Sequence, residues 1–181
     1  GEETLGLRLN WNKRYITLSP VATLLGLAFK AKDPDHLIGD TEELGITCAL
    51  IPVATPGVWT GNRHFPVGAV FMNGPTKGTD VFIPMDYVIG GQERIGQGWR
   101  MLMHSLAAGR AISLPALGTA GTRFSAKYSG EYARIRKQFG IPIAYLEGIE
   151  EPLARMAGEA YRVNAARLLT LSALELGEKP G

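Results

Sequence analysis

The hydrophobic pattern of this chain changes at Gly98, and that change decides the expected fold class. Before Gly98, short apolar runs alternate with clusters of Gly, Pro, Asn and Asp, which is typical of strands joined by turns. After it, apolar residues recur every three to five positions from Leu102 to Tyr132, as in a long helix. We therefore predict an α+β fold, with an antiparallel β-barrel or sandwich followed by long antiparallel helices that form an incomplete bundle.

Short strands fill the first predicted domain, residues 1–93. Two of them flank Asn10–Lys13, a cluster of turn-forming residues that suggests a hairpin. Asp33–Asp35 and Asn73–Pro75 are further turn signals between strands. The predicted strands are Leu5–Leu9, Arg14–Leu18, Leu24–Ala31, Ile46–Val53, Val67–Phe71 and Thr79–Ile83.

Two helices fill the second predicted domain, residues 94–181. The first, Gly98–Gln138, contains a proline, so we expect a kink or a break at Ser113–Pro115. The second, Glu147–Leu176, has acids and a proline in its opening turn, where both are tolerated. The short link Gly140–Tyr145 makes the pair antiparallel, and two helices alone leave part of their apolar faces uncovered.

A candidate binding site lies where the first helix must end. Arg134, Arg136, Gln138 and Phe139 cluster just before Gly140, a residue type that ends helices. Guanidinium groups bind phosphate or pyrophosphate well, and an aromatic edge suits a flat ring. The cluster fits either an anion-plus-ring site or a solvated helix end, where cations are favoured by about 0.3–1 kcal/mol.

Composition narrows the class of function. Of the 19 Lys and Arg residues, 7 lie in residues 1–93 and 12 in residues 94–181, against 10 and 7 of the 17 acids. The positive surplus of the second half suits phosphate-bearing ligands, nucleic acid or anionic lipid, and it equally suits ordinary solvated helix faces. Cys48 is the only cysteine, so no internal disulfide is possible. We expect no metal site and no membrane span.

Five motifs follow one another along the chain. They are Lys13-Arg14-Tyr15-Ile16-Thr17, Pro56-Gly57-Val58, Asp80-Val81-Phe82-Ile83-Pro84, Gly96-x-Gly98-Trp99 with Arg110 downstream, and Arg136-Lys137-Gln138-Phe139-Gly140. This ordered set resembles the acyl-CoA dehydrogenase family, in its middle β domain and the first part of its C-terminal helical domain. The nearest likeness is to large bacterial fatty-acyl-CoA dehydrogenases. The resemblance implies a fragment of a longer enzyme, with an N-terminal helical domain and most of the C-terminal bundle missing.

The resemblance implies FAD as cofactor and assigns roles in the β domain and on the long helix. Tyr15 and Thr17 match a strand that lies against the isoalloxazine ring, and alternate strand residues share a face. Arg110 matches an Arg close to the substrate site, and a surface cation is an equally good reading of it. Trp99 is expected to anchor the helix start against the β domain.

The same resemblance assigns roles at the end of the long helix. Arg136, Gln138 and Phe139 match a segment that reaches the FAD of a neighbouring subunit, where the Arg contacts the pyrophosphate. Ile143 matches an apolar position near that cofactor. The FAD site would thus be complete only in a homodimer or a higher oligomer.

The implied reaction is α,β-dehydrogenation of fatty acyl-CoA in β-oxidation, with electrons passed to an electron-transfer flavoprotein. A carboxylate must remove the α-proton, but Ala107, Ala108 and Gly109 beside Arg110 cannot accept one. We therefore predict no catalytic base in this chain, and no activity of the chain alone. The expected location is the cytoplasm, or the periphery of the inner membrane for the complete protein. Alternatives are an oxidase on the same fold and a nucleic-acid-associated flavoprotein, although no nucleic-acid partner is expected.

Overall fold

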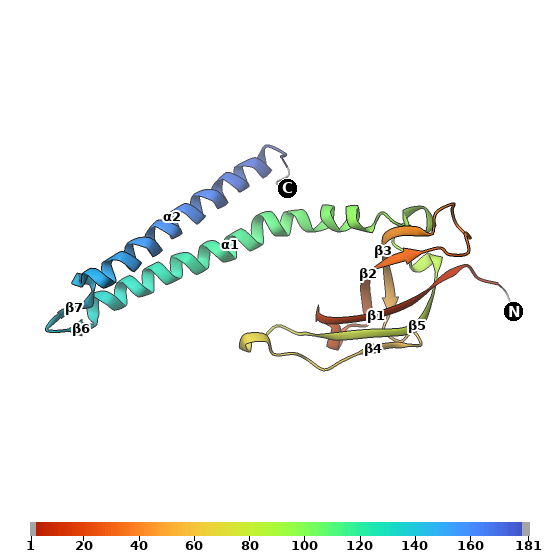
Figure 1. Cartoon of the computed structure of the whole chain (residues 1–181), viewed down its shortest axis with the longest axis horizontal. Coiled ribbons are helices and arrows are strands. Elements are labelled where there is room, and N and C mark those ends of the chain that lie inside the picture. The colour runs from red at the N-terminus through yellow and green to blue at the C-terminus, as the bar shows by residue number, and fades with distance from the viewer. Residues whose placement is uncertain (1–2, 179–181) are drawn as a thin grey trace. The chain divides into compact units, whose positions relative to one another are not determined.

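The computed structural model describes residues 3–178 and divides into two compact units, the first up to Leu102 and the second from Met103 (Figure 1). Antiparallel strands make up most of the first unit and long helices the second, so the predicted α+β class is confirmed. The elements are β1 Gly6–Thr17, β2 Leu24–Lys32, β3 Glu43–Pro52, β4 Val58–Thr60, β5 Asn73–Pro84, α1 Gly98–Ile135, β6 Lys137–Gln138, β7 Ile141–Pro142 and α2 Glu147–Glu175.

Two small sheets enclose the core of the first unit. β5 is the central strand of a three-stranded antiparallel sheet in the order β1-β5-β4, and β2 pairs with β3 in a separate antiparallel ladder. Apolar side chains from both sheets are buried against one another, and they are Leu9, Leu27, Ala49, Ile51, Val81 and Ile83. Within the described residues the sheets do not close into a barrel.

The predicted hairpin at Asn10–Lys13 is wrong, because β1 runs through this cluster as one strand. The register explains the error. Leu9 pairs with Val81 and Trp11 with Gly78, so Asn10 lies opposite an extra residue of β5. The Asn10 side-chain oxygen accepts a hydrogen bond of 3.0 Å from the backbone N–H of Asp80 in that bulge. Asn10, a residue type common in turns, thus stabilises a β-bulge here.

Two further expectations of the first domain are wrong. Asn73–Pro75 is the beginning of β5 and not a turn. The predicted strand Val67–Phe71 begins inside the short 3₁₀ turn Pro66–Gly68 and continues as irregular backbone. Pro75 is tolerated in the central strand because it lies at the register shift between Lys13 and Ile16 of β1, where the ladder is interrupted. Strand β4 was not predicted.

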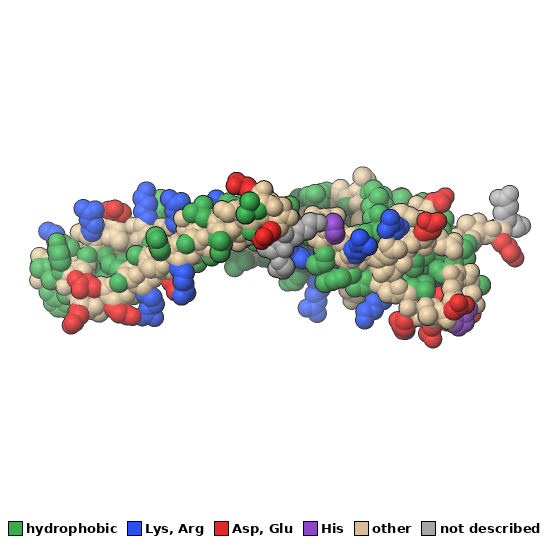
Figure 2. Space-filling model, turned by 90° about the horizontal axis from the view of Figure 1, so that it is seen from above, with side chains coloured by type: hydrophobic (Ala, Val, Ile, Leu, Met, Phe, Trp, Pro, Cys, Tyr) green, Lys and Arg blue, Asp and Glu red, His purple; other side chains and the backbone are tan. Residues whose placement is uncertain are grey.

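The helices follow the prediction more closely. α1 continues through Pro115, so the predicted interruption is not a break, and α2 begins at Glu147 as expected. The link between them forms the two-stranded β6–β7 hairpin, which the sequence did not suggest. Large apolar side chains of both helices stay exposed, including Leu117, Tyr161 and Leu169. Figure 2 shows hydrophobic side chains on the surface of the helical unit.

A buried carboxylate organises the turn after β2. The Asp33 side chain accepts hydrogen bonds from the backbone N–H groups of Ile38, at 2.8 Å, and Leu37, at 2.9 Å. These bonds stabilise the ionised carboxylate and lower the pKa of Asp33 below its ordinary value of 3.8, against the opposing effect of burial. Asp33 therefore holds the first part of the segment between β2 and β3 against the end of β2.

We expect Asp33→Asn to destabilise the chain at neutral pH and to matter less in acid. A lowered folded-state pKa gives stability that is fully present above the unfolded-state pKa and is lost as the pH falls through the folded-state pKa. In urea unfolding, the free energies of unfolding of the unsubstituted chain and of Asp33→Asn should differ at about pH 7 and converge as the pH falls to about 2. The exposed neighbour Asp35→Asn is the control. A difference that grows in acid would contradict the assignment.

Candidate functional site

Two predicted site residues lie at the end of β1. The side chain of Tyr15 is 66% exposed, and its ring meets the ring of His64 edge-on, with centroids 5.0 Å apart. Thr17 is also exposed and is the ladder partner of Asn73 on β5. An aromatic face and a hydroxyl are therefore open to a ligand at this end of the strand.

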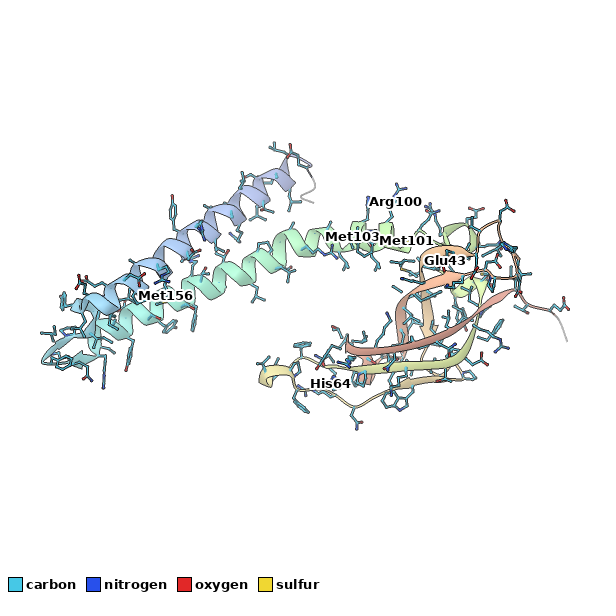
Figure 3. The ribbon with its side chains drawn as sticks, in the orientation of Figure 1. Glu43, His64, Arg100, Met101, Met103 and Met156 are labelled. Atoms are coloured by element: carbon cyan, nitrogen blue, oxygen red, sulfur yellow. The ribbon has the colours of Figure 1, made fainter. Side chains whose placement is uncertain are left out.

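His64 in the connection between β4 and β5, and Asn73 at the beginning of β5, are two further residues that sequence reasoning missed. His64, labelled in Figure 3, donates its backbone N–H to the carbonyl of Asn73 at 2.8 Å. Asn73 is 3% exposed, and its side-chain oxygen has no hydrogen-bond partner among the described residues. No sequence signal identifies this pair, because only the register of β1 on β5 brings it beside Tyr15 and Thr17.

The other predicted cofactor residues gather on the β6–β7 hairpin. Gln138 pairs with Ile141, and the carbonyl of Arg136 accepts the N–H of Ile143 at 2.8 Å. Phe139 and Gly140 form the two-residue turn, with φ values of 53° and 81°. Positive φ at both positions is the mark of a type I′ hairpin turn.

The two arginines before this hairpin differ in their partners. Arg134 forms an ion pair with Glu131 of 3.4 Å. Arg136 is exposed and forms no ion pair within residues 3–178. The second guanidinium is therefore the one available to an anion.

Phe139 is strained and exposed at the tip of the hairpin. A bulky aromatic residue with a φ of 53° is unusual, and its side chain is 90% exposed. Strain of this kind persists where the rest of the structure enforces it, often at binding sites.

We expect Phe139→Asn to stabilise the chain by about 1 kcal/mol, because Asn tolerates the left-handed conformation better than Phe. Thermal unfolding checks the gain. Phe71→Asn, at an exposed Phe without positive φ, is the control and should change stability little. A loss of stability in Phe139→Asn would mean that the exposed ring contributes packing instead of strain.

Arg110 lies far from the hairpin within the same unit. Its guanidinium approaches the sulfur of Met103 at 3.1 Å and is exposed. About 25 residues of continuous helix separate it from the end of α1, which is roughly 40 Å at 1.5 Å per residue. Arg110 and Arg136 of one chain therefore cannot share one small-molecule site.

Two cavities lie away from these residues. One of about 460 Å³ is lined by residues of β1, β2 and the following turn, among them Arg8 and Asp33. One of about 420 Å³ lies between α1 and α2, beside Thr122 and Met156. In the described part of the chain, no group of three His, Cys, Asp or Glu residues is placed to hold a metal ion. Neither long helix is apolar enough over its length to cross a bilayer.

Comparison with known proteins identifies the family. The family model for the acyl-CoA dehydrogenase C-terminal domain matches residues 96–180. The short/branched chain specific acyl-CoA dehydrogenase of Bos taurus mitochondria is 30% identical over 172 residues, which are 94% of this chain and 37% of that protein. The chain belongs to the acyl-CoA dehydrogenase family. Protein HemX of Proteus mirabilis is 54% identical over 103 residues, which are 57% of this chain and 61% of that protein.

Solved structures of other proteins share this fold. Acyl-CoA dehydrogenase from Geobacillus kaustophilus matches with a TM-score of 0.77 at 20% identity, over 98% of this chain and 45% of that one. The FAD complex of PigA matches with a TM-score of 0.71 at 25% identity, over 95% of this chain and 43% of that one. This acyl-CoA dehydrogenase family chain thus spans less than two thirds of each of these relatives.

Proposed function

We propose that this chain is part of a longer FAD-dependent dehydrogenase that introduces a double bond between the α and β carbons of fatty acyl-CoA. The supporting observation is the 30% identity to an acyl-CoA dehydrogenase over 94% of the chain. An alignment of that length includes both the Tyr15 and the Arg136 segments. Membership of the family supports the assignment as an oxidoreductase, and we propose β-oxidation as the pathway in which the reaction serves.

The residues present fit a flavin cofactor. Tyr15 offers an exposed aromatic ring, Thr17 a hydroxyl, and Asn73 beside them a buried oxygen with no partner among residues 3–178. Arg136 offers an exposed guanidinium suited to bind a pyrophosphate in bidentate fashion. These groups match a dinucleotide with a flat polar ring at one end and two phosphates in its middle.

When bound, FAD would accept a hydride from the β carbon of the substrate. In the proposed site, Tyr15 would pack against the ring system, and the Thr17 hydroxyl would donate a hydrogen bond to it. Arg136, Gln138 and Phe139 would hold the diphosphate part, with Ile143 as an apolar neighbour. Arg110 would lie near the substrate. The carboxylate that removes the α-proton is proposed to come from residues outside this chain, because Ala107, Ala108 and Gly109 are its helix neighbours.

We propose that the complete enzyme is a homodimer or a higher oligomer in which the hairpin binds the FAD of a neighbouring subunit. The separation of roughly 40 Å between Arg110 and Arg136 along α1 supports this arrangement, because one chain cannot bring both to one substrate and cofactor. The exposed apolar side chains of α1 and α2 also need cover. An electron-transfer flavoprotein is the proposed electron acceptor.

Anaerobic titration of the complete protein with saturated fatty acyl-CoA thioesters tests the proposal. We expect the purified protein to carry FAD, and its visible absorbance to bleach as the thioester is oxidised. Reduced flavin should then react faster with an electron-transfer flavoprotein than with oxygen. Rapid reaction with oxygen would identify an oxidase instead, and a complete protein without flavin would contradict the proposal altogether.

A further inference from the structure

Two buried polar groups beside Tyr15 have no partner in the described part of the chain. They are the side-chain oxygen of Asn73, a residue only 3% exposed, and Nδ1 of the His64 ring. Leaving such a group unsatisfied costs about 1–3 kcal/mol, so each native example requires an explanation. A ligand that completes the missing hydrogen bonds is one explanation.

Three contacts or pairings link Asn73 and His64 with each other and with the predicted flavin residues Thr17 and Tyr15. Thr17 and Asn73 are directly opposite in the β1–β5 ladder, so their side chains lie on the same face of the sheet. The backbone N–H of His64 donates to the carbonyl of Asn73 at 2.8 Å. The ring of His64 in turn meets the ring of Tyr15, with 5.0 Å between their centroids. Thr17, Asn73, His64 and Tyr15 are therefore neighbours in this order, each in contact with or paired to the next.

The surrounding backbone holds the pair in place. Gly74, directly after Asn73, has no room for a side chain, since a Cβ atom there would lie 2.7 Å from Pro20 and 2.9 Å from the carbonyl of Asn62. The backbone N–H of Leu18 donates to the carbonyl of Met72 at 2.8 Å. The backbone around Asn73 and His64 is therefore closely packed and hydrogen-bonded.

We propose that Asn73 and His64 are further cofactor-binding residues, which hydrogen-bond to the polar edge of the flavin ring. This inference rests on the proposed function. The flavin ring is a flat heterocycle that carries both hydrogen-bond donors and acceptors. The unpartnered Asn73 oxygen accepts a hydrogen bond, and Nδ1 of His64 donates or accepts one according to its tautomer, so both atoms match such an edge. Tyr15 and Thr17 then form one side of the ring site, and Asn73 and His64 complete it.

FAD titration of the complete protein tests this assignment. Asn73→Leu keeps the approximate shape of the side chain, and His64→Phe keeps a ring against Tyr15 while removing its nitrogens. We expect each to weaken FAD binding about tenfold and to shift the visible absorption band of the bound flavin. The thermal midpoint of the FAD-free protein should stay level or rise in both, because a buried polar atom without a partner is removed. Asn62→Leu, at an exposed neighbouring position, should change neither property.

The outcomes separate this inference from the proposed function. A wild-type protein that binds no FAD contradicts the proposed function itself. If the wild-type protein and both variants bind FAD with the same affinity and the same spectrum, only the assignment of Asn73 and His64 is overturned, and the proposed function stands. Marked destabilisation of the FAD-free protein by either substitution would also overturn it for that residue, because the side chain would then serve the fold.

Discussion

Replacing Gly96 by Ala is expected to lower the free energy of unfolding of the first unit by about 2–4 kcal/mol. Two causes act together. Gly96 has a φ of 80°, a conformation that L side chains rarely adopt. A Cβ atom would also lie 2.0 Å from the backbone carbonyl oxygen of Leu44, which no side-chain rotation can relieve. The N–H of Gly96 donates to the hydroxyl of Thr47 at 2.9 Å, so a shift would strain that bond too.

Urea unfolding of Gly96→Ala beside Gly91→Ala measures the effect. Gly91 has a φ of 71°, but nothing lies within 4 Å of the position its Cβ would take. With a ψ of −167° Gly91 also has a backbone conformation that side chains disfavour, so this control should lose only the conformational part, about 1–3 kcal/mol. Equal losses at the two positions would show that the contact with Leu44 does not matter.

This glycine segment, and not the neighbouring tryptophan, attaches the beginning of α1 to the first unit. Gln97 bridges to Ile46 of β3, and a Cβ on Gly98 would lie 2.7 Å from the carbonyl oxygen of Ile46. Trp99 is 58% exposed, so its expected role as the anchor is wrong. Close backbone approach requires an absent side chain, which a large ring cannot provide.

Replacing Arg136 by Ala in the complete protein is expected to weaken FAD binding about 10- to 100-fold. The guanidinium of Arg136 is exposed and has no ion-pair partner within residues 3–178, so its charge is available to a diphosphate. A charge-assisted bidentate contact contributes more than a neutral hydrogen bond. Arg136→Lys should retain part of the affinity, because it keeps the charge and loses the fork geometry.

Arg134→Ala is the matched control for this substitution. Arg134 lies two positions earlier and forms an ion pair with Glu131, so its removal should change FAD affinity much less. Flavin fluorescence quenching in a titration gives the dissociation constants of all three variants. Equal weakening in Arg134→Ala and Arg136→Ala would indicate a general loss of positive charge instead of one specific contact.

Local periodicity was sufficient to predict the helices and several strands. β2 begins at Leu24 and α2 at Glu147, as expected, because these elements form from neighbours in the chain. Asn10 and Asn73–Pro75 carried turn signals and lie in strands instead. Their partners are strands far away in the sequence, and bulges in the ladder accommodate the residues that usually interrupt a strand.

Part of the candidate site could likewise be predicted from the sequence, and part could not. Arg136 to Ile143 are close in the sequence, so their closeness in space was expected. The hairpin that they form was not expected, because its turn contains Phe139, and a bulky residue is rarely found at positive φ.

By itself, the sequence determined the change from strands to helices at Gly98 and the cationic end of α1, because both depend on residues within a few positions of each other. Only the tertiary structure placed Asn73 and His64 beside Thr17 and Tyr15, because strand register, which no short segment contains, decides which distant side chains meet.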